Sequence, residues 1–404
     1  MDQLSIDPIP WQEDSSVLLL NPRLPQSLQE NWQKVFAQIS SGKKWIGVTT
    51  SGTGKEFPKI ALLTRSALMA SARAVTEHLA ISSEDKWFHI LPDFHVGGLG
   101  IWARSKVSGC QVYKPVNWQW DPHKFVNGLK KSCATWSSVV PTQVFDLVSN
   151  NLKAPAHLKA LLVGGGAISN SLFHRAQELS WPLLLTYGMT ECCSQIATAT
   201  LKDLRGGAGI PRLRLLSHIQ VRVGIQSLLQ IKSPALFEGY LQANGFGLDG
   251  CKLEGFEFDF FDPKQDGWFQ TSDRVNLTGD GFLQPMGRVD NQVKILGELV
   301  DLVPIQALVD NYFLAAQLGQ EGVVVPLPDS RCGHRLVLIV EGRKKVSEQV
   351  KQVIDRVNRQ LLPFERIQEF QFVAQFPRTE LGKISTWQLL QITSRQLGSG
   401  SFGE

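Results

Sequence analysis

The chain has 404 residues, of which 43% are hydrophobic and 19% charged, a length at which more than one hydrophobic core is expected. The formal charge is only +4 and the basic residues are scattered, which argues against a nucleic-acid-binding surface. The N-terminus does not resemble a secretory signal and no apolar run approaches the ~20 residues of a membrane span, so we expect a cytoplasmic protein without membrane insertion.

The first part of the chain alternates helical and strand patterns. Amphipathic helical segments lie around Leu24 to Ile39, and Trp45 to Val48 is typical of a strand. A glycine-rich loop follows this strand. After the loop, one face of a predicted helix carries Leu68, Ala72, Val75 and Leu79.

The same pattern repeats further along. Ala160 to Val163 predicts a second strand and Leu183 to Leu185 a third. The helix predicted between these two strands has an apolar face made of Leu172, Phe173, Ala176 and Leu179. Six cysteines without a CxxC pair or metal-ligand spacing indicate reduced structural thiols.

A change of periodicity marks the second half. Residues 215–283 favour a β-rich subdomain, because apolar residues alternate between many turn residues. Beyond Asp290 strands and helices alternate again, and residues 398–404 (GSGSFGE) are expected to be a disordered tail. We therefore expect an α/β fold with an N-terminal domain of residues 1–289 and a C-terminal domain of residues 290–404.

The loop after the first strand, Thr49 to Lys59 (TTSGTGKEFPK), combines glycines, hydroxyl groups and two lysines. Backbone N–H groups, hydroxyls and positive charge together favour a phosphate-binding loop. It is not a Walker A motif, because Lys55 is followed by Glu56 and the required first glycine is replaced by Thr49. A flexible surface loop is the alternative.

Three later segments carry further candidate residues. Thr186 to Glu191 (TYGMTE) ends a strand, where α/β sheets bind ligands, with a ring that could stack on a purine and a carboxylate that could hold Mg²⁺. Asp273 and Arg288 are suited to ribose hydroxyls or phosphate. Lys383 lies on a glycine-containing loop. Taken singly, each segment is also compatible with a solvated turn or a surface charge.

In this order the segments resemble the acyl-adenylate-forming superfamily of acyl-CoA synthetases, luciferases and adenylation domains, over about residues 48–384. The resemblance implies a large N-terminal domain of α/β sheets with a β-rich subdomain, and a small mobile α+β C-terminal domain. It implies ATP, Mg²⁺ and coenzyme A as the partners of a carboxylic acid. The segments that carry it are TSGT followed by PK, YGMTE, GWFQTSD, GRVDNQVKILGE and PRTELGKI.

The resemblance assigns roles at the nucleotide. The residues it implies are Thr50, Ser51, Gly52, Thr53 and Lys59 at the phosphates, Tyr187 and Gly188 at the adenine, and Asp273 and Arg288 at the ribose.

The resemblance also assigns roles in the chemistry. Thr190 and Glu191 would hold the α-phosphate and Mg²⁺, and Lys383 would bridge the carboxylate and the α-phosphate during adenylation. Asp290 matches the family's hinge and Gly297 its path for the pantetheine arm. Such an enzyme forms an acyl-adenylate and then transfers the acyl group to CoA, two steps that need different groups at one site.

The short length and the segment Leu91 to Arg104 (LPDFHVGGLGIWAR) resemble one branch of the family, the o-succinylbenzoate:CoA ligases of menaquinone and phylloquinone biosynthesis. His95 would lie over the acyl pocket as a catalytic or substrate-binding residue, and Arg104 would face the second carboxylate of this substrate. The residues alone leave a core histidine and a surface arginine as alternatives. The glycines at 164–166 (Gly164, Gly165 and Gly166) resemble the loop beside the acyl pocket.

Other functions remain open from the sequence. The nearest is a CoA ligase for another aryl or short acyl acid, and a more distant one is a catalytically idle nucleotide-binding homologue. A luciferase-type oxygenase shares every motif, whereas a phosphotransferase would need the absent Walker loop. The resemblance allows a homodimer, although no segment of the sequence identifies an interface.

Overall fold

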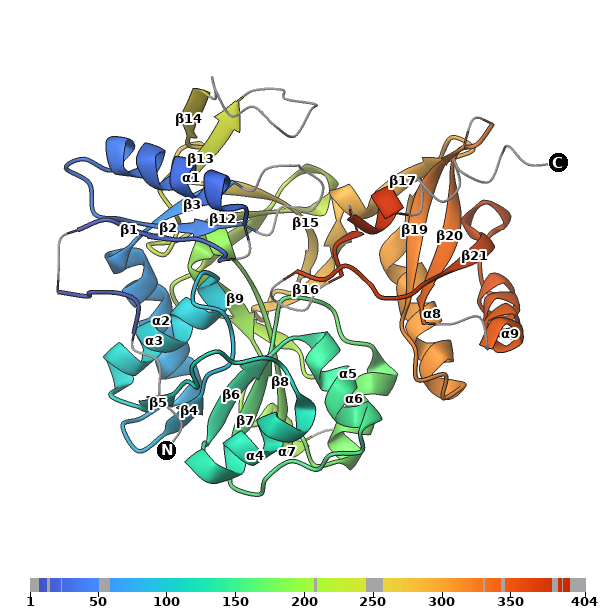
Figure 1. The fold of residues 1–404 in the computed structure, drawn as a ribbon, viewed down its shortest axis with the longest axis horizontal. Coiled ribbons are helices and arrows are strands. Elements are labelled where there is room, and N and C mark those ends of the chain that lie inside the picture. The colour runs from blue at the N-terminus through green and yellow to red at the C-terminus, as the bar shows by residue number, and fades with distance from the viewer. Residues whose placement is uncertain are drawn as a thin grey trace.

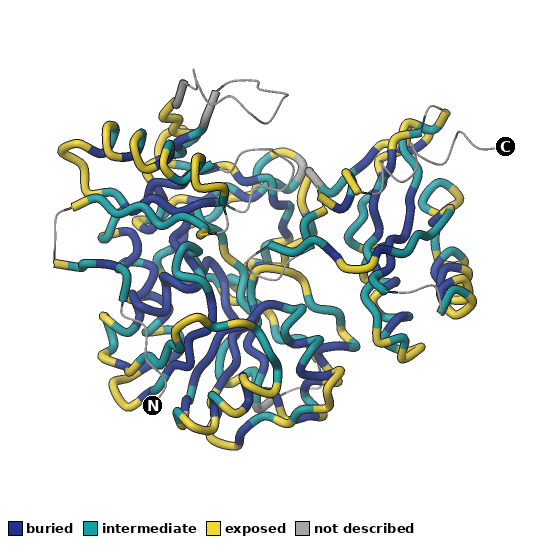
Figure 2. Tube along the Cα trace, in the orientation of Figure 1, coloured by how far each residue is buried: buried dark blue, intermediate teal, exposed yellow. Residues whose placement is uncertain are grey.

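The structure is a computed structural model with two lobes, the elements up to β16 in the larger and those from β17 onward in the smaller (Figure 1). The buried segments run mainly along the central strands of each lobe (Figure 2). Within the described residues, no helix is both long and apolar enough to cross a membrane. The described residues are 7–12, 15–22, 24–50, 59–206, 209–244, 257–329, 331–342, 346–379, 384–386 and 388–392.

One sheet of the larger lobe has five strands among the described residues. Helix α1 (Gln26–Ile39) covers one face, where Trp32 and Phe36 pack against Ile60 and Leu241. The opposite face packs against helix α2. The predicted strand at Trp45 is confirmed, and it pairs with its neighbours in the order β1 (Val17–Leu19), β2 (Trp45–Thr49), β3 (Ile60–Thr64), β13 (Gly239–Asn244) and β14 (Glu257–Phe261).

The second sheet has eleven strands in the described part of the chain. One half is parallel and the other antiparallel, and β8 joins them because it runs parallel to β7 and antiparallel to β9. In spatial order the strands are β11 (Gln220–Val223), β12 (Leu228–Lys232), β15 (Phe269–Leu277), β16 (Phe282–Arg288), β10 (Leu213–Leu215), β9 (Ser194–Thr198), β8 (Leu183–Met189), β7 (Ala160–Val163), β6 (Trp136–Val139), β4 (Lys86–Phe88) and β5 (Gln111–Tyr113).

Helices cover both faces of the parallel half. Successive residues of each strand point to opposite faces, so Trp87 and Leu184 pack on the side of α2 and α3, whereas Phe88 and Leu183 pack on the side of α4 to α6. The helices are α2 (Arg65–Leu79), α3 (Val96–Ser108), α4 (Pro122–Ser132), α5 (Pro141–Ser149), α6 (Asn170–Glu178) and α7 (Asp203–Gly206).

Local sequence explains where these helices begin. The side chain of Thr64 accepts a hydrogen bond from the backbone N–H of Ala67 at the start of α2, and Asp121 does the same for Lys124 at the start of α4. Proline occupies the first position of α4, where its missing N–H costs nothing.

The smaller lobe has its own hydrophobic core. Val324, Leu336 and Leu338 point to helices α8 and α9, whereas Val325 and Val337 point to the other face. Its elements are β17 (Gln292–Ile295), β18 (Glu298–Asp301), α8 (Leu302–Ala315), β19 (Gly322–Asp329), β20 (Gly333–Glu341), α9 (Ser347–Asn358) and β21 (Ile367–Val373). These two lobes of mixed helix and sheet confirm the predicted fold class.

The lobes touch through α6 and α8. The hydroxyl of Ser171 donates a hydrogen bond of 2.6 Å to the side-chain oxygen of Asn311, and Leu314 packs against the helix-covered core of the larger lobe. This contact fixes one relative position of the lobes in the structure.

Candidate active site

The centre of the candidate site is the end of β8, where the eleven-stranded sheet changes from parallel to antiparallel. The chain turns through a 3-10 helix, Thr190–Cys192, and returns as β9. A Cβ atom at Gly188 would lie 1.8 Å from the carbonyl oxygen of Ser194, so only glycine permits this close approach of β8 and β9. Strand ends of this kind are common ligand sites in α/β sheets.

Three predicted nucleotide-binding residues meet here. Asp273 on β15 lies opposite Arg288 on β16, and the two side chains form an ion pair of 3.0 Å. The phenol of Tyr187 donates a hydrogen bond to the other carboxylate oxygen of Asp273. Burial, followed by the charge of Asp273, raises the pKa of Tyr187, which therefore stays a neutral donor. A fixed carboxylate beside an aromatic ring is suited to a ribose next to its base.

A second group surrounds Glu191. The phenol of Tyr240 on β13 donates to a carboxylate oxygen of Glu191, and burial together with that carboxylate raises the pKa of Tyr240. The backbone carbonyl of Glu191 accepts a hydrogen bond of 2.8 Å from Phe237. The ammonium of Lys59 lies 4.9 Å from the centre of the Tyr240 ring. Tyr240 thus connects Glu191 to Lys59.

Both ends of the predicted phosphate loop lie beside this group of residues. The described segment before the loop ends at Thr50, and the segment after the loop begins at Lys59. The Thr50 N–H donates a hydrogen bond of 2.8 Å to the Lys59 carbonyl. Ser51, Gly52 and Thr53 lie outside the described residues. The two ends of the loop are therefore held together beside Tyr240.

The glycines after β7 lie next to the same strand end. A Cβ atom at Gly164 would be 3.0 Å from the methyl group of Thr186, and Gly165 has a φ of +82°, which favours glycine. Gly166 faces Pro141, whose ring would be 3.4 Å from an added Cβ. The three glycines therefore place no side chain at this edge of the site.

Helix α3 brings His95 and the site together. His95 is the residue before the helix begins, and the first turn, through Val96 and Leu99, packs in one cluster with Cys193 and Phe237. The start of α3 therefore lies against the segment that carries Glu191.

Arg104, on the same helix, is 2% exposed, so the surface alternative is wrong. Its guanidinium lies 4.8 Å from the centre of the Trp87 ring, and its Nε has no hydrogen-bond partner among the described residues. Burial lowers its pKa to about 10, which leaves it charged at neutral pH. A Cβ atom at Gly100 would lie 3.1 Å from Arg104 Nη1 and 3.5 Å from the side chain of Ser194, next to β8. A buried cation without a carboxylate partner is costly unless a ligand supplies the anion.

The remaining predicted residues follow β16 in the chain. Asp290 lies in the 3-10 turn Val289–Asn291 that connects the lobes. Gly297 occupies the turn between β17 and β18 with a φ of +87°. Lys383 is outside the described residues.

Mg²⁺ is compatible with these residues. No group of three or more His, Cys, Asp or Glu side chains within the described ranges could hold a metal by itself. Mg²⁺ is usually held by one or two carboxylates together with substrate phosphates. One carboxylate, Glu191, beside a predicted phosphate loop fits that mode of binding.

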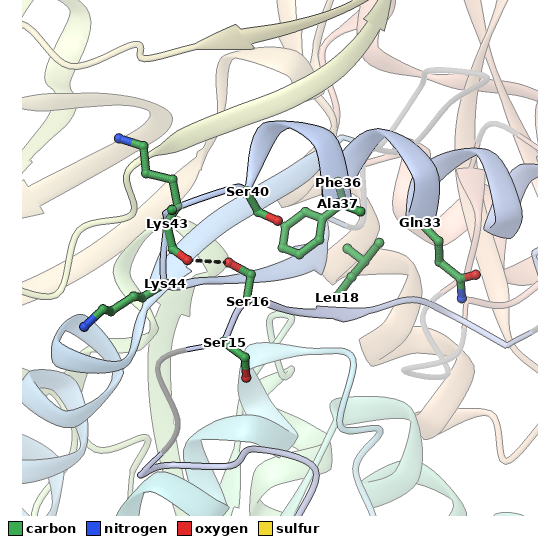
Figure 3. Close-up of a pocket in the computed structure, with 10 residues that line it drawn as sticks. Ser15, Ser16, Leu18, Gln33, Phe36, Ala37, Ser40, Lys43 and Lys44 are labelled. Carbon is green, nitrogen blue, oxygen red and sulfur yellow. Dashed lines mark hydrogen bonds between the residues drawn. The ribbon is translucent and has the colours of Figure 1, made fainter.

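A cavity of about 620 Å³ lies away from these residues, between α1, β1 and the start of β2. In Figure 3 the ends of the Lys43 and Lys44 side chains point away from Phe36 and Leu18, which also line it. None of the predicted site residues lines it.

Comparison with known proteins identifies the family. The AMP-binding enzyme family matches residues 48–241, and the C-terminal domain of AMP-binding enzymes matches residues 309–383. A 2-succinylbenzoate–CoA ligase of Salmonella typhimurium is 31% identical over 354 residues, covering 80% of this chain and 70% of the relative. The chain belongs to the AMP-binding enzyme family. A 2-succinylbenzoate–CoA ligase of Enterococcus faecalis is 28% identical, covering 83% of this chain and 67% of the relative.

Solved structures of this family share the fold. An o-succinylbenzoate CoA synthetase of Bacillus subtilis, in complex with the acyl-adenylate intermediate OSB-AMP, has a TM-score of 0.67 at 23% identity and covers 85% of this chain and 68% of its own. A MenE protein of E. coli with bound OSB-AMS has a TM-score of 0.71 at 24% identity, covering 95% and 88%.

Proposed function

We propose that the protein is an ATP-dependent acid–thiol ligase that converts o-succinylbenzoate to its acyl-adenylate and then to o-succinylbenzoyl-CoA. The observation that carries the proposal is the convergence of Tyr187, Asp273 and Arg288 with Glu191 at one strand end. The named relatives support the choice of reaction and acid. We also propose that it acts in the cytoplasm, where ATP and CoA are present.

In this proposal the larger lobe binds the nucleotide. Asp273 accepts hydrogen bonds from the ribose hydroxyls and Arg288 keeps that carboxylate in place, while the Tyr187 ring stacks on adenine over Gly188. The triphosphate lies along the loop that Thr50 and Lys59 close, with Ser51, Gly52 and Thr53 between them. The chemistry that Mg²⁺ would supply when bound is neutralisation of phosphate charge. Glu191 would hold that ion and Thr190 the α-phosphate.

The acid occupies the space between α3 and the glycines at 164–166. His95 faces its acyl part, and Arg104 supplies the positive charge for the carboxylate that does not react. This assignment gives the buried guanidinium an anionic partner, because Arg104 has no ion pair with a carboxylate in the described part of the chain.

The smaller lobe completes each half-reaction. Lys383 would stabilise the charge that develops between the carboxylate and the α-phosphate. The domain boundary at residues 289 and 290, with Asp290 as hinge, would let this lobe change position before CoA attacks. Gly297, without a side chain, would line the path of the pantetheine arm.

The test is AMP release by the purified protein with ATP, Mg²⁺ and CoA, across o-succinylbenzoate, benzoate, 4-coumarate and hexanoate. We expect strong turnover with o-succinylbenzoate alone. Turnover with another acid instead would keep the ligase but reject the acid, and no turnover with any of them would favour the idle nucleotide-binding homologue.

A further inference from the structure

Asp93 is the centre of a charged cluster that the proposed reaction does not use. It lies in the turn between β4 and α3, two residues before His95. One of its carboxylate oxygens, Oδ1, accepts three hydrogen bonds: 3.0 Å from His89 Nε2, 2.9 Å from Trp102 Nε1 and 2.7 Å from Lys114 Nζ. His89 comes directly after β4, Trp102 lies within α3, and Lys114 comes directly after β5. One carboxylate therefore connects three elements.

The cluster is largely removed from solvent. The side chains of His89, Lys114 and Asp93 are 0%, 12% and 23% exposed. Burial lowers the pKa of His89 to about 4, which makes it a neutral donor. Burial alone would raise the pKa of Asp93, but the hydrogen bond from His89 and the charge of Lys114 outweigh burial and hold that pKa at about 2. A buried lysine requires such a partner.

The turn that leads to His95 is fixed by the same groups. Lys114 also donates to the carbonyl of Leu91 over 2.9 Å, and His95 N–H donates to the carbonyl of Pro92 over 3.3 Å. A Cβ atom at Gly98 would lie 2.2 Å from that carbonyl oxygen, so the turn packs directly on the first turn of α3. Asp93 lies within this turn, so the groups that hold its carboxylate also hold the backbone that leads to His95.

We propose that Asp93 is a positioning residue that holds His95 in place for the acid. The assignment of His95 to the acid rests on the proposed function, whereas the coupling between Asp93 and His95 rests on the contacts above. Side chains that define a site need such support, because a displacement of about 1 Å can cost about 100-fold in rate.

Asp85 provides a matched control at the opposite end of β4. It is also a buried carboxylate, 1% exposed, and it accepts hydrogen bonds from Lys159 Nζ at 2.6 Å and from Thr135 at 2.8 Å. Loss of its charge removes an ion pair of a buried carboxylate with a half-exposed lysine, 49% exposed, without touching the turn before α3.

The experiment compares wild type, D93N, H95A, the double variant D93N/H95A and D85N by ATP–pyrophosphate exchange with o-succinylbenzoate. We expect D93N to lower kcat/KM for the acid by about tenfold or more, and to change it less than about twofold when His95 is already alanine. D85N should lower the Tm as D93N does while leaving kcat/KM within about twofold of wild type. The positioning role would be overturned if the fold-changes in kcat/KM caused by D93N and H95A multiply in the double variant. It would also be overturned if D85N lowers kcat/KM as much as D93N does.

A second readout does not depend on activity. In protein labelled with ¹³C at the histidine ring, the His95 signal is identified by its loss in H95A. We expect D93N to shift this signal and D85N to leave it in place, and an unshifted signal in D93N would overturn the proposal. If none of the acids supports pyrophosphate exchange by the wild-type protein, the proposed function fails. The histidine signals still decide whether Asp93 positions His95.

Discussion

Tyr187 and Asp273 are 86 positions apart in the chain, yet the phenol of one donates a hydrogen bond to the carboxylate of the other. In the sheet β9, β10 and β16 lie between β8 and β15. Because neighbouring strands are about 4.8 Å apart, the two side chains can meet only if the sheet curves strongly here. The ring and the carboxylate therefore form one wall of the candidate site before any nucleotide binds.

The first prediction concerns this wall. Asp273→Asn removes the charge that faces the ribose and the ion pair with Arg288, so KM for ATP should rise by about tenfold to 100-fold, the equivalent of about 1.5–3 kcal/mol for a charge-assisted hydrogen bond. Steady-state kinetics with varied ATP checks it. Asp280→Asn is the control, since Asp280 is 59% exposed in the hairpin between β15 and β16. An unchanged KM for ATP in D273N would reject the ribose assignment.

The second prediction concerns Arg104. Arg104→Met should raise KM for o-succinylbenzoate by about tenfold to 100-fold but have little effect on an analogue that lacks the second carboxylate. It should also raise the Tm, because the variant removes a buried cation that has no ion pair with a carboxylate among the described residues. Kinetics with both acids and thermal unfolding are the measurements, with the exposed Arg175→Met as control. Equal losses with both acids would contradict the role.

The third prediction separates the two half-reactions. Lys383→Ala should lower adenylation by about 100-fold or more, because the charge that develops at the α-phosphate loses its partner. Thioester formation from supplied acyl-adenylate and CoA should continue at the wild-type rate. Single-turnover assays of each step check this, with Lys351→Ala on α9 as control, since that lysine is 61% exposed. An equal loss of both steps would be incompatible with the assignment.

The fourth prediction concerns stability at acidic pH. The pKa of His89 is lowered from 6.5 to about 4 by burial, so the unfolded chain takes up a proton through this range and the folded chain does not. The free energy of unfolding is therefore highest above pH 6.5 and falls as the pH falls towards 4. The decrease is about 3 kcal/mol, at about 1.4 kcal/mol per pKa unit.

Urea unfolding at a series of pH values measures this dependence. His89→Gln, which retains a donor for Asp93, should flatten the dependence between pH 6.5 and 4. His174→Gln should not, since His174 is exposed on α6. A pH dependence unchanged in H89Q would show that His89 is not the group responsible.

The structure agrees with the sequence analysis where a signal is local. Strands at Trp45 and Ala160 were predicted because each is a short apolar run that ends at glycine or hydroxyl residues. Strand β3 was missed, because Ile60 to Thr64 continues directly into α2 and the combined apolar run has no turn to separate them.

Contacts between distant residues were harder to predict. Tyr240 lies in a β-rich region, where tyrosine is common, and only the pairing of β13 with β3 brings it to Glu191. Asp93 follows His89 at a spacing of four, but the third member, Lys114, comes from beyond another helix. The motif residues could thus be named from sequence, whereas the residues that support them required the fold.

The most direct test of the central claim is mass spectrometry of the products from the purified protein with ATP, Mg²⁺, CoA and o-succinylbenzoate. We predict o-succinylbenzoyl-CoA with one AMP and one pyrophosphate for each thioester. ADP and phosphate instead of AMP and pyrophosphate, or AMP without any thioester, would contradict it.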